Sequence, residues 1–300
     1  MDKLEIISTL KLLKAAPLKK MGQNFLICKK ALNKIVLAAD LQKESNILEI
    51  GPGLGILTQK LLANKNKVIA VEKDAKYCFY LRKKFSVELN QQLQIIQGDI
   101  LEINILKLLR KHFINNNSRQ QEFPEYQVVA NLPYNIASKI IRIFLEISNR
   151  PSQMTLLLQK EVAERICAKP PKMNSLALII KLIATPKIAC IIKGSCFYPK
   201  PKVDSAAITL KNINQKLNFQ QTSTKNLLQS IKIGFASPRK ILLNNLTNGF
   251  SLDKIRLESI IEEIGKKKEV RAQELTLGEW KKLNQKIRKL EKNKEAKKIN

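Results

Sequence analysis

Short apolar runs alternate with helical segments between Asn46 and Leu158, and this alternation limits the possible folds more than any other feature. The runs are rich in Ile, Val and Leu, so we expect five strands, at 46–50, 67–71, 93–97, 126–130 and 154–158. Helices of about a dozen residues are predicted between them, including 74–85, with Asp74 as its N-cap, and 136–147. This alternation predicts an α/β fold with a mainly parallel, doubly wound sheet and helices on both faces.

The pattern changes after Lys211, where a polar, linker-like stretch is followed only by helical segments. Four short helices are expected there, at 227–235, 240–246, 252–264 and 272–283. None of them can bury an apolar face alone, so we expect them to pack together. The predicted organisation is a first domain over residues 1–214, a small all-helical domain over 215–285 and a basic, frayed tail over 286–300.

The balance of charges favours a polyanionic partner. Lys and Arg number 54 against 25 Asp and Glu, which leaves a formal net charge of +29. A coding bias could raise the number of lysines, but it would not explain the small number of acidic residues. We therefore expect the protein to bind nucleic acid.

A membrane and an export route are both disfavoured by the sequence. The longest apolar stretch, Ser175 to Gly194, contains Lys181, Pro186 and Lys187, so it is unsuited to span a bilayer and is predicted as two buried strands. The first 20 residues lack an apolar core followed by a small-residue cleavage site. We expect a cytoplasmic protein with no membrane partner.

Metal and thiol chemistry are not expected. The five cysteines form no C-x-x-C pair, and the chain has a single histidine, His112. The residue types for a structural zinc site or a Cys-His catalytic pair are therefore missing. We interpret the cysteines as reduced thiols of a cytosolic protein and predict no metal site.

Four predicted strands are followed by residues that suit a bound ligand: Gly51, Glu72, Asp99 and Asn131. In open parallel sheets, ligands bind beyond the carboxyl ends of the strands. Gly51 opens a Gly-x-Gly-x-Gly turn that lets the backbone approach a ligand, and Glu72 follows about 20 residues later, where an acidic group reaches ribose hydroxyls. Because position 56 is Ile, the spacing departs from the dinucleotide motif. An adenosine-containing cofactor other than NAD is predicted.

The segment Asn131-Leu132-Pro133-Tyr134 carries the sharpest local signal. Pro133 keeps Leu132 extended, which turns the carbonyls of Asn131 and Leu132 outward, where they can accept hydrogen bonds. Two such acceptors would hold the hydrogens of an adenine amine and direct its lone pair toward a methyl donor. Tyr134 could stack on a base flipped out of its helix. A plain strand-to-helix turn with a core tyrosine is the alternative reading of this segment.

Seven segments, in order along the chain, resemble the ribosomal RNA adenine dimethyltransferases. They are GQNFL at 22–26, EIGPGLG at 49–55, VEKD at 71–74, GD at 98–99, NLPYNI at 131–136, QKEVAER at 159–165 and FYPKPKVDS at 197–205. The last two are more similar to the enzymes that act on small-subunit RNA than to those that modify large-subunit RNA. The resemblance extends over about residues 20–250 and implies a Rossmann-like methyltransferase domain that uses S-adenosylmethionine.

The resemblance also implies roles for single residues in cofactor binding. Asn24 and Leu26 would contact S-adenosylmethionine from the N-terminal segment, and Gly51 would approach its amino-acid part. Glu72 would bind its ribose, and Asp99 would hold its adenine.

A second set of implied roles concerns the RNA. Asn131 would face both the methyl donor and the target amine, and Leu132 would shape a compact pocket for the amine. Tyr134 and Phe197 would enclose the target base, although composition alone would assign Phe197 to the core. Two cations of the helical domain would contact RNA phosphates: Arg239 and Lys240.

The resemblance implies an enzyme that dimethylates adenine N6 on two adjacent adenosines near the 3′ end of small-subunit ribosomal RNA. We expect a monomer that acts on an immature 30S-type particle. The alternatives are a non-catalytic RNA-binding assembly factor and a large-subunit RNA or DNA adenine methyltransferase. The chain departs from the family near 173–176, where the usual Tyr-Gly pair is missing, and at Pro238, where many relatives have a basic residue.

Overall fold

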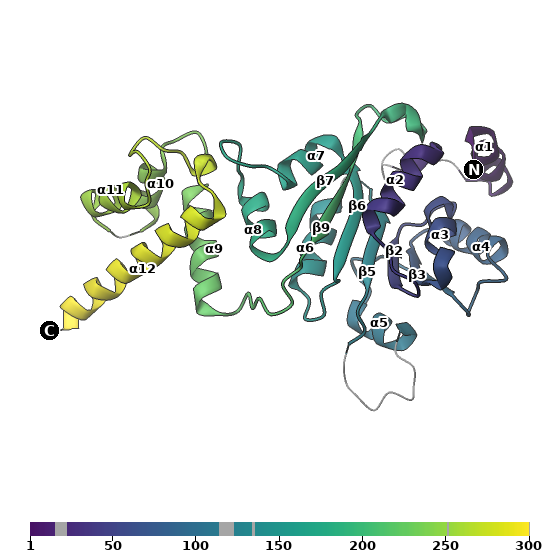
Figure 1. Cartoon of the computed structure of the whole chain (residues 1–300), viewed down its shortest axis with the longest axis horizontal. Coiled ribbons are helices and arrows are strands. Elements are labelled where there is room, and N and C mark those ends of the chain that lie inside the picture. The colour runs from purple at the N-terminus through teal and green to yellow at the C-terminus, as the bar shows by residue number, and fades with distance from the viewer. Residues whose placement is uncertain (16–22, 114–122, 134–135, 251, 300) are drawn as a thin grey trace. The chain divides into compact units, whose positions relative to one another are not determined.

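The computed structural model describes residues 1–15, 23–113, 123–133, 136–250 and 252–299 (Figure 1). The chain forms two compact units. The first contains Met1–Ala163 and Thr185–Gln215, and the second contains Glu164–Ala184 and Lys216–Asn300. The segment Glu164–Ala184 therefore packs in the second unit, although the predicted first domain, residues 1–214, includes it.

The strands all belong to the first unit: β1 (Phe25–Leu26), β2 (Asn46–Ile50), β3 (Lys67–Glu72), β4 (Leu93–Gln97), β5 (Gln127–Asn131), β6 (Gln153–Gln159), β7 (Thr185–Ile192), β8 (Phe197–Tyr198) and β9 (Ser205–Lys211). Its helices are α1 (Lys3–Leu12), α2 (Lys29–Ala39), α3 (Ile56–Leu61), α4 (Ala75–Lys84), α5 (Ile105–Phe113) and α6 (Ala137–Glu146), and α7 (Lys160–Ile166) leads into the second unit. The second unit holds α8 (Ser175–Ile183), α9 (Thr222–Gly234), α10 (Leu242–Gly249), α11 (Lys254–Glu263) and α12 (Leu277–Ile299).

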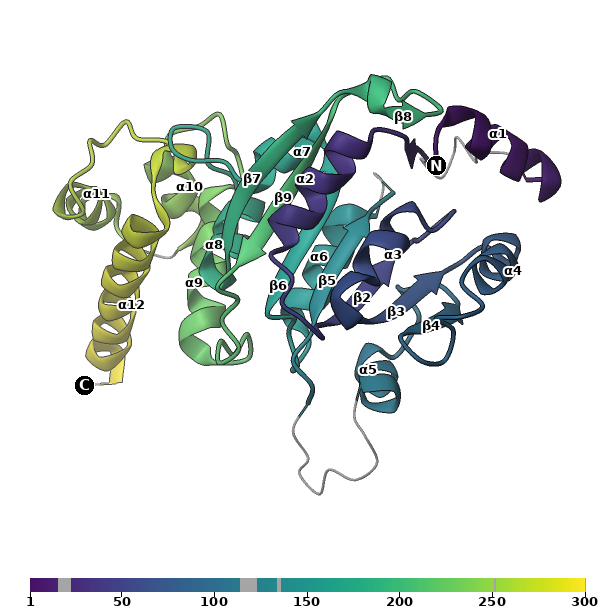
Figure 2. The same cartoon turned by 45° about the vertical axis from the view of Figure 1, so that its right-hand side comes forward.

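Seven strands form one sheet in the order β4-β3-β2-β5-β6-β9-β7. The strands from β2 to β6 pair in parallel, so that Ile50 lies opposite Val71 on one side and Ala130 on the other. Strand β9 is antiparallel to both β6 and β7. Helices α2 and α3 lie over one face of the sheet and α6 lies over the other (Figure 2). The predicted α/β fold with a mainly parallel, doubly wound sheet is confirmed.

The local signals agree with this fold. All five predicted strands are present, as β2 to β6, and the two named helices are α4 and α6. Asp74 caps α4 as predicted, because its carboxylate accepts a hydrogen bond from the amide of Lys76 at 2.8 Å. Asp74 thus fixes where the chain turns away from the end of β3.

The prediction of two buried strands over 175–194 is wrong, because the chain forms α8 and then β7. Asn174 caps α8 by accepting a hydrogen bond from the amide of Ala177 at 3.0 Å. The chain becomes extended at Ala184, and β7 then joins the edge of the sheet beside β9. An apolar run alone does not distinguish a buried helix from a strand, and here the polar cap decides for the helix.

The second unit is helical and is built around Trp280, which is fully buried. A Cβ at Gly234 would lie 2.2 Å from the Trp280 ring, so the glycine lets α9 pack closely against it. Helix α12 continues to Ile299, through most of the segment that we expected to be frayed. None of the helices in the described ranges combines the length and the apolar composition needed to cross a membrane.

Candidate active site

The carboxyl ends of β2 and β5 meet where the strand order of the sheet reverses. Gly51 follows β2 with a φ of +67°, a conformation that favours glycine. A Cβ at Gly51 would lie 3.9 Å from the carbonyl oxygen of Asn131, so the glycine turn and the end of β5 are neighbours. This is the position at which ligands of open parallel sheets bind.

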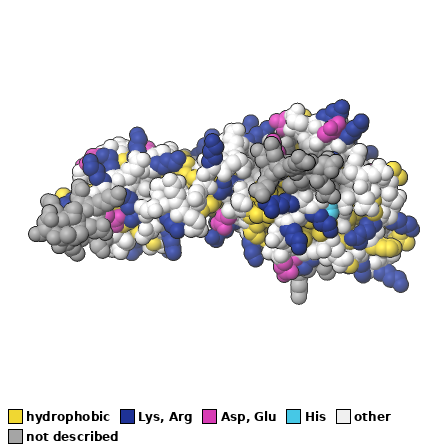
Figure 3. Space-filling model, turned by 90° about the horizontal axis from the view of Figure 1, so that it is seen from below, with side chains coloured by type: hydrophobic (Ala, Val, Ile, Leu, Met, Phe, Trp, Pro, Cys, Tyr) yellow, Lys and Arg dark blue, Asp and Glu magenta, His cyan; other side chains and the backbone are white. Residues whose placement is uncertain are grey.

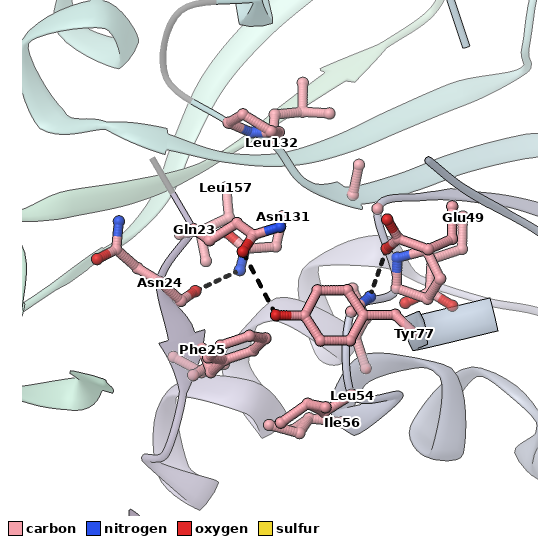
Figure 4. Close-up of a pocket in the computed structure, with 18 of the residues that line it drawn as sticks. Gln23, Asn24, Phe25, Glu49, Leu54, Ile56, Tyr77, Asn131, Leu132 and Leu157 are labelled. Carbon is pink, nitrogen blue, oxygen red and sulfur yellow. Dashed lines mark hydrogen bonds between the residues drawn. The ribbon is translucent and has the colours of Figure 1, made fainter. Parts of the chain in front are cut away.

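Two adjoining cavities lie at these strand ends. They share four lining residues: Gln23, Gly51, Glu72 and Pro133. The first cavity is also lined by four residues with predicted roles: Asn24, Leu26, Asn131 and Leu132. Figure 4 labels Asn24, Asn131 and Leu132 among them. Asp99 lines the second cavity. The fold thus brings together every residue for which a cofactor contact was predicted.

Glu72 ends β3 and is only 6% exposed. One carboxylate oxygen accepts a hydrogen bond from the amide of Gly53 at 3.0 Å, and the other accepts one from the amide of Asp74 at 2.9 Å. Burial raises the pKa of Glu72, and these backbone hydrogen bonds oppose the shift. Each oxygen can still accept a second hydrogen bond, for example from a hydroxyl group of a ligand.

Asn131 ends β5 and is tied to the N-terminal segment. Its side-chain Nδ2 donates a hydrogen bond to the carbonyl oxygen of Asn24 at 3.1 Å (Figure 4). This bond uses the donor end of the amide and points its acceptor, Oδ1, away from Asn24. The amide of Leu132 donates to the carbonyl of Leu157 at 3.2 Å, so the hydrogen bonding between β5 and β6 continues beyond the end of β5.

Asp99 follows β4 and is held by two hydrogen bonds. Its Oδ1 accepts from the amide of Leu101 and its Oδ2 from Nζ of Lys73, both at 2.9 Å. The Leu101 amide and then Lys73 lower the pKa of Asp99, so the carboxylate is ionised at neutral pH. Lys73 had no predicted role, and it follows Glu72 directly in the sequence.

Three further residues without a predicted role line the first cavity: Gln23, Phe25 and Tyr77. The rings of Phe25 and Tyr77 meet edge to face with their centroids 6.0 Å apart. The Tyr77 hydroxyl lies 3.4 Å from Oε1 of Gln23, to which it donates a hydrogen bond. Gln23 and Phe25 flank Asn24 in the GQNFL segment, and Tyr77 lies on α4 just after its Asp74 cap. These local patterns could have indicated that all three residues lie near the cavity.

Glu49, on β2, also lines the first cavity and had no predicted role. The residue is 1% exposed, and its Oε2 accepts no hydrogen bond from the described part of the chain. Burial raises the pKa of Glu49 to about 8, so the side chain is mainly protonated at neutral pH. Sequence alone does not show this state, because it depends on how completely the fold removes water.

Glu49→Gln is expected to change how stability depends on pH. Between the ordinary glutamate pKa and about 8, the folded protein binds a proton at Glu49 that the unfolded chain lacks, so the wild type loses stability as pH rises. Glutamine cannot ionise, and the variant should gain stability relative to the wild type, by on the order of a few kcal/mol, between pH 5.5 and pH 8.5. Urea unfolding at both pH values measures this difference. Glu44→Gln, at an exposed position, serves as the control; a pH-independent difference for Glu49→Gln would contradict the shifted pKa.

The remaining predicted residues lie elsewhere or outside the described part of the chain. Phe197 is 3% exposed and packs in an apolar cluster with Leu26 and Leu32, so its ring does not line either cavity. Tyr134 lies outside the described residues. Arg239 and Lys240 are exposed in the turn between α9 and α10 of the second unit.

The donor set of the two cavities fits S-adenosylmethionine. A glycine turn, a buried carboxylate at the end of β3 and an ionised carboxylate after β4 are suited to the amino-acid, ribose and adenine parts of such a molecule. The unpaired Oε2 of Glu49 adds a polar group at the cavity wall that lacks a partner in the described part of the protein. Within the described ranges, no three His, Cys, Asp or Glu side chains gather as a metal site would require.

Comparison with known proteins gives matches along most of the chain. A family model described as ribosomal RNA adenine dimethylase matches residues 17–288. Two proteins called ribosomal RNA small subunit methyltransferase A, from Dehalococcoides mccartyi and Crocosphaera subtropica, are 37% and 39% identical over 265 and 275 residues. Each alignment covers 88% of this chain, and they cover 86% and 96% of the two relatives.

Two solved structures are similar over nearly their full length. A dimethyladenosine transferase from Plasmodium falciparum gives a TM-score of 0.68 at 25% identity, over 87% of this chain and 98% of that chain. The 23S rRNA methyltransferase ErmE shares the fold, with a TM-score of 0.69 at 22% identity over 88% of this chain and 100% of that chain. Because the family model matches residues 17–288, a range that includes the strand ends described above, the chain belongs to the ribosomal RNA adenine dimethylase family.

Proposed function

We propose that this protein transfers methyl groups from S-adenosylmethionine to adenine N6, twice per base, on two adjacent adenosines near the 3′ end of small-subunit ribosomal RNA. One observation carries the proposal: Gly51, Glu72 and Asn131 meet around one cavity at the switch point of the sheet. Membership of the family supports adenine dimethylation. The names of the two curated relatives support small-subunit RNA as the substrate.

In this proposal the end of each strand binds a different part of the cofactor. Glu72 accepts hydrogen bonds from the ribose hydroxyls, and Asp99 binds the adenine side. The backbone at Gly51 contacts the amino-acid part, and Asn24 and Leu26 close the cavity from the N-terminal segment. When bound, S-adenosylmethionine supplies an electrophilic methyl group on a sulfonium sulfur.

Asn131 and Leu132 hold the target amine. Their main-chain carbonyl oxygens accept hydrogen bonds from the N–H groups of adenine N6, which turns the nitrogen lone pair toward the methyl carbon. Methyl transfer to this nitrogen would form an N–C bond in place of the S–C bond, and the two acceptors would stabilise the positive charge that develops on the amine. The methylated nitrogen then gives a proton to water, so no side chain has to act as a base. Positioning and the acceptors that meet the developing charge supply the catalysis.

Tyr134 and Phe197 enclose the target base in this proposal. Because Phe197 is 3% exposed, side chains of its cluster, such as Leu26, have to move before a base can reach the ring. Leu132 leaves room for a monomethylated amine to rotate and react again. Release of only monomethylated product at saturating cofactor would contradict this role of Leu132.

The charge of the molecule supports an RNA substrate. Basic side chains are spread over the face shown in Figure 3, and acidic ones are few there. Such a surface binds phosphates without reading sequence, so recognition of one RNA region requires further contacts. We propose that an immature 30S-type particle provides them, and that the protein acts in the cytoplasm as a monomer without a metal ion.

Arg239→Ala combined with Lys240→Ala is expected to weaken RNA binding about 10-fold and to reduce the salt dependence of binding by about two released ions. Both residues are exposed cations that are proposed to contact phosphates. Filter binding at salt concentrations between about 50 and 200 mM measures both quantities. Over this range, proteins that contact more phosphates lose about 10³-fold in affinity. Lys43→Ala with Lys60→Ala removes the same charge from exposed positions of the first unit. Equal loss of affinity in both double variants would show that only net charge matters.

The function is tested by methylation of RNA followed by mass spectrometry of its nucleosides. The protein is incubated with S-adenosylmethionine and either naked small-subunit RNA or immature small subunits. N6,N6-dimethyladenosine at two adjacent positions supports the proposal, whereas binding without methylation would support a non-catalytic assembly factor. Large-subunit RNA and duplex DNA are included as competing substrates, and preferential methylation of either would overturn the proposed substrate.

A further inference from the structure

Helix α1 packs against the outer side of residues that line the first cavity. Ile6 and Leu10, one turn apart, are 0% and 5% exposed and form one apolar cluster with Phe25, Leu54 and Tyr77. These last three residues also line the cavity. A single layer of side chains therefore separates α1 from a ligand in the cavity.

The contact continues from α1 to the glycine turn through Phe25. A Cβ at Gly53 would lie 3.2 Å from Cε1 of Phe25, so the ring rests directly on the turn. The amide of Gly53 donates to the carboxylate of Glu72 at 3.0 Å. A displacement of Phe25 would thus act on the turn and on the carboxylate that is proposed to bind the ribose.

Helix α4 holds α1 near both of its ends. Nζ of Lys84 donates to the carbonyl of Leu54 at 2.9 Å and lies 3.7 Å from Sδ of Met1. Nζ of Lys76 donates to the carbonyl of Lys14 at 2.6 Å. Because α4 also carries Tyr77, the same helix supports α1 and the cavity wall.

We propose that Ile6 and Leu10 are positioning residues for cofactor binding, which hold Phe25 and Tyr77 so that the first cavity keeps the shape that binds S-adenosylmethionine. The inference rests on the proposed function for the identity of the ligand. It concerns a helix that precedes the family match, which begins at residue 17. The same helix offers a matched control, since Leu4 and Leu12 are 76% and 79% exposed.

Thermodynamic linkage makes the coupling reciprocal. If docking of α1 raises the affinity for the cofactor, bound cofactor must favour the docked α1 by the same factor. A factor of about 10 is typical of such coupling. Two measurements that do not depend on each other therefore test the proposal.

The first measurement is calorimetric titration of the full chain with S-adenosylmethionine. Ile6→Ala with Leu10→Ala is expected to weaken binding about 10-fold, and Leu4→Ala with Leu12→Ala to leave it unchanged. Ile6→Leu with Leu10→Met should restore the affinity, because the apolar volume is kept. In methylation assays the first pair should raise the KM for the cofactor and leave the KM for RNA unchanged, which a general loss of stability would not do.

The second measurement is amide hydrogen exchange of α1 in the wild-type protein, and it decides the matter if the alanine pair does not fold. Saturating S-adenosylmethionine is expected to slow exchange in α1 about 10-fold. The role proposed for Ile6 and Leu10 would be overturned if both alanine pairs bound S-adenosylmethionine with equal affinity. It would also be overturned if the cofactor did not change the rate of amide exchange in α1. Neither result would affect the proposed function. A wild-type protein that binds no S-adenosylmethionine would overturn the proposed function as well.

Discussion

Asn131→Ala is expected to lower the rate of methyl transfer at saturating substrates by at least about 100-fold. The substitution removes the side chain that is proposed to face both the methyl donor and the target amine, and it breaks the hydrogen bond from Nδ2 to the carbonyl of Asn24, while the main-chain carbonyl of residue 131 remains. The affinity for RNA should change less than about twofold, because phosphate contacts come from cations elsewhere. Single-turnover transfer of labelled methyl groups, together with filter binding, measures the two effects.

Asn46→Ala is the matched control for this experiment. The Asn46 side chain donates to the carbonyl of Glu125 at 3.0 Å, so its removal costs a similar hydrogen bond at the opposite end of the neighbouring strand. We expect this variant to keep its transfer rate. A similar loss in both variants would indicate damage to the sheet, and an active Asn131→Ala protein would refute the assigned role.

Glu72→Ala is expected to weaken binding of S-adenosylmethionine by at least about 100-fold, because hydrogen bonds to a charged group are each worth about 1.5–3 kcal/mol. The substitution also leaves the amides of Gly53 and Asp74 without their acceptor, which loosens the turn beside the cavity. Glu72→Gln keeps one acceptor oxygen and should bind with intermediate affinity. Calorimetric titration ranks the three proteins.

Glu102→Gln provides the control, since this nearby carboxylate is exposed and lines neither cavity. It should bind the cofactor as the wild type does. Wild-type affinity in Glu72→Ala would exclude the ribose from the end of β3 and would place the ligand elsewhere.

The sequence predicts those parts of the fold that depend on local patterns of residues. Buried parallel strands are continuous apolar runs, so β2 to β6 and the order of their helices were predictable, as was the Asp74 cap. The strand-end residues were predictable for a related reason, because parallel strands place their carboxyl ends at one edge of the sheet. For this reason the amino-acid sequence alone is enough to predict that Gly51, Glu72 and Asn131 meet.

The remaining features depend on contacts between distant residues. Leu26 pairs with Phe197 across the short β1–β8 ladder, and this pairing, which no local pattern announces, contributes to the burial of the Phe197 ring. The antiparallel insertion of β9 between β6 and β7 has the same origin. The pKa of Glu49 depends on complete removal of water by the packed fold, and the Lys73–Asp99 pair on the proximity of β3 and β4.

The hydrogen bond from the Leu132 amide to the carbonyl of Leu157 has a mechanical consequence. It anchors Leu132 to the interior strand β6. The atoms that are proposed to bind the amine are therefore held as rigidly as the sheet itself. Bulky substitutions inside β6, such as at the buried Thr155, would then misalign the reaction from a distance, without touching any bound molecule.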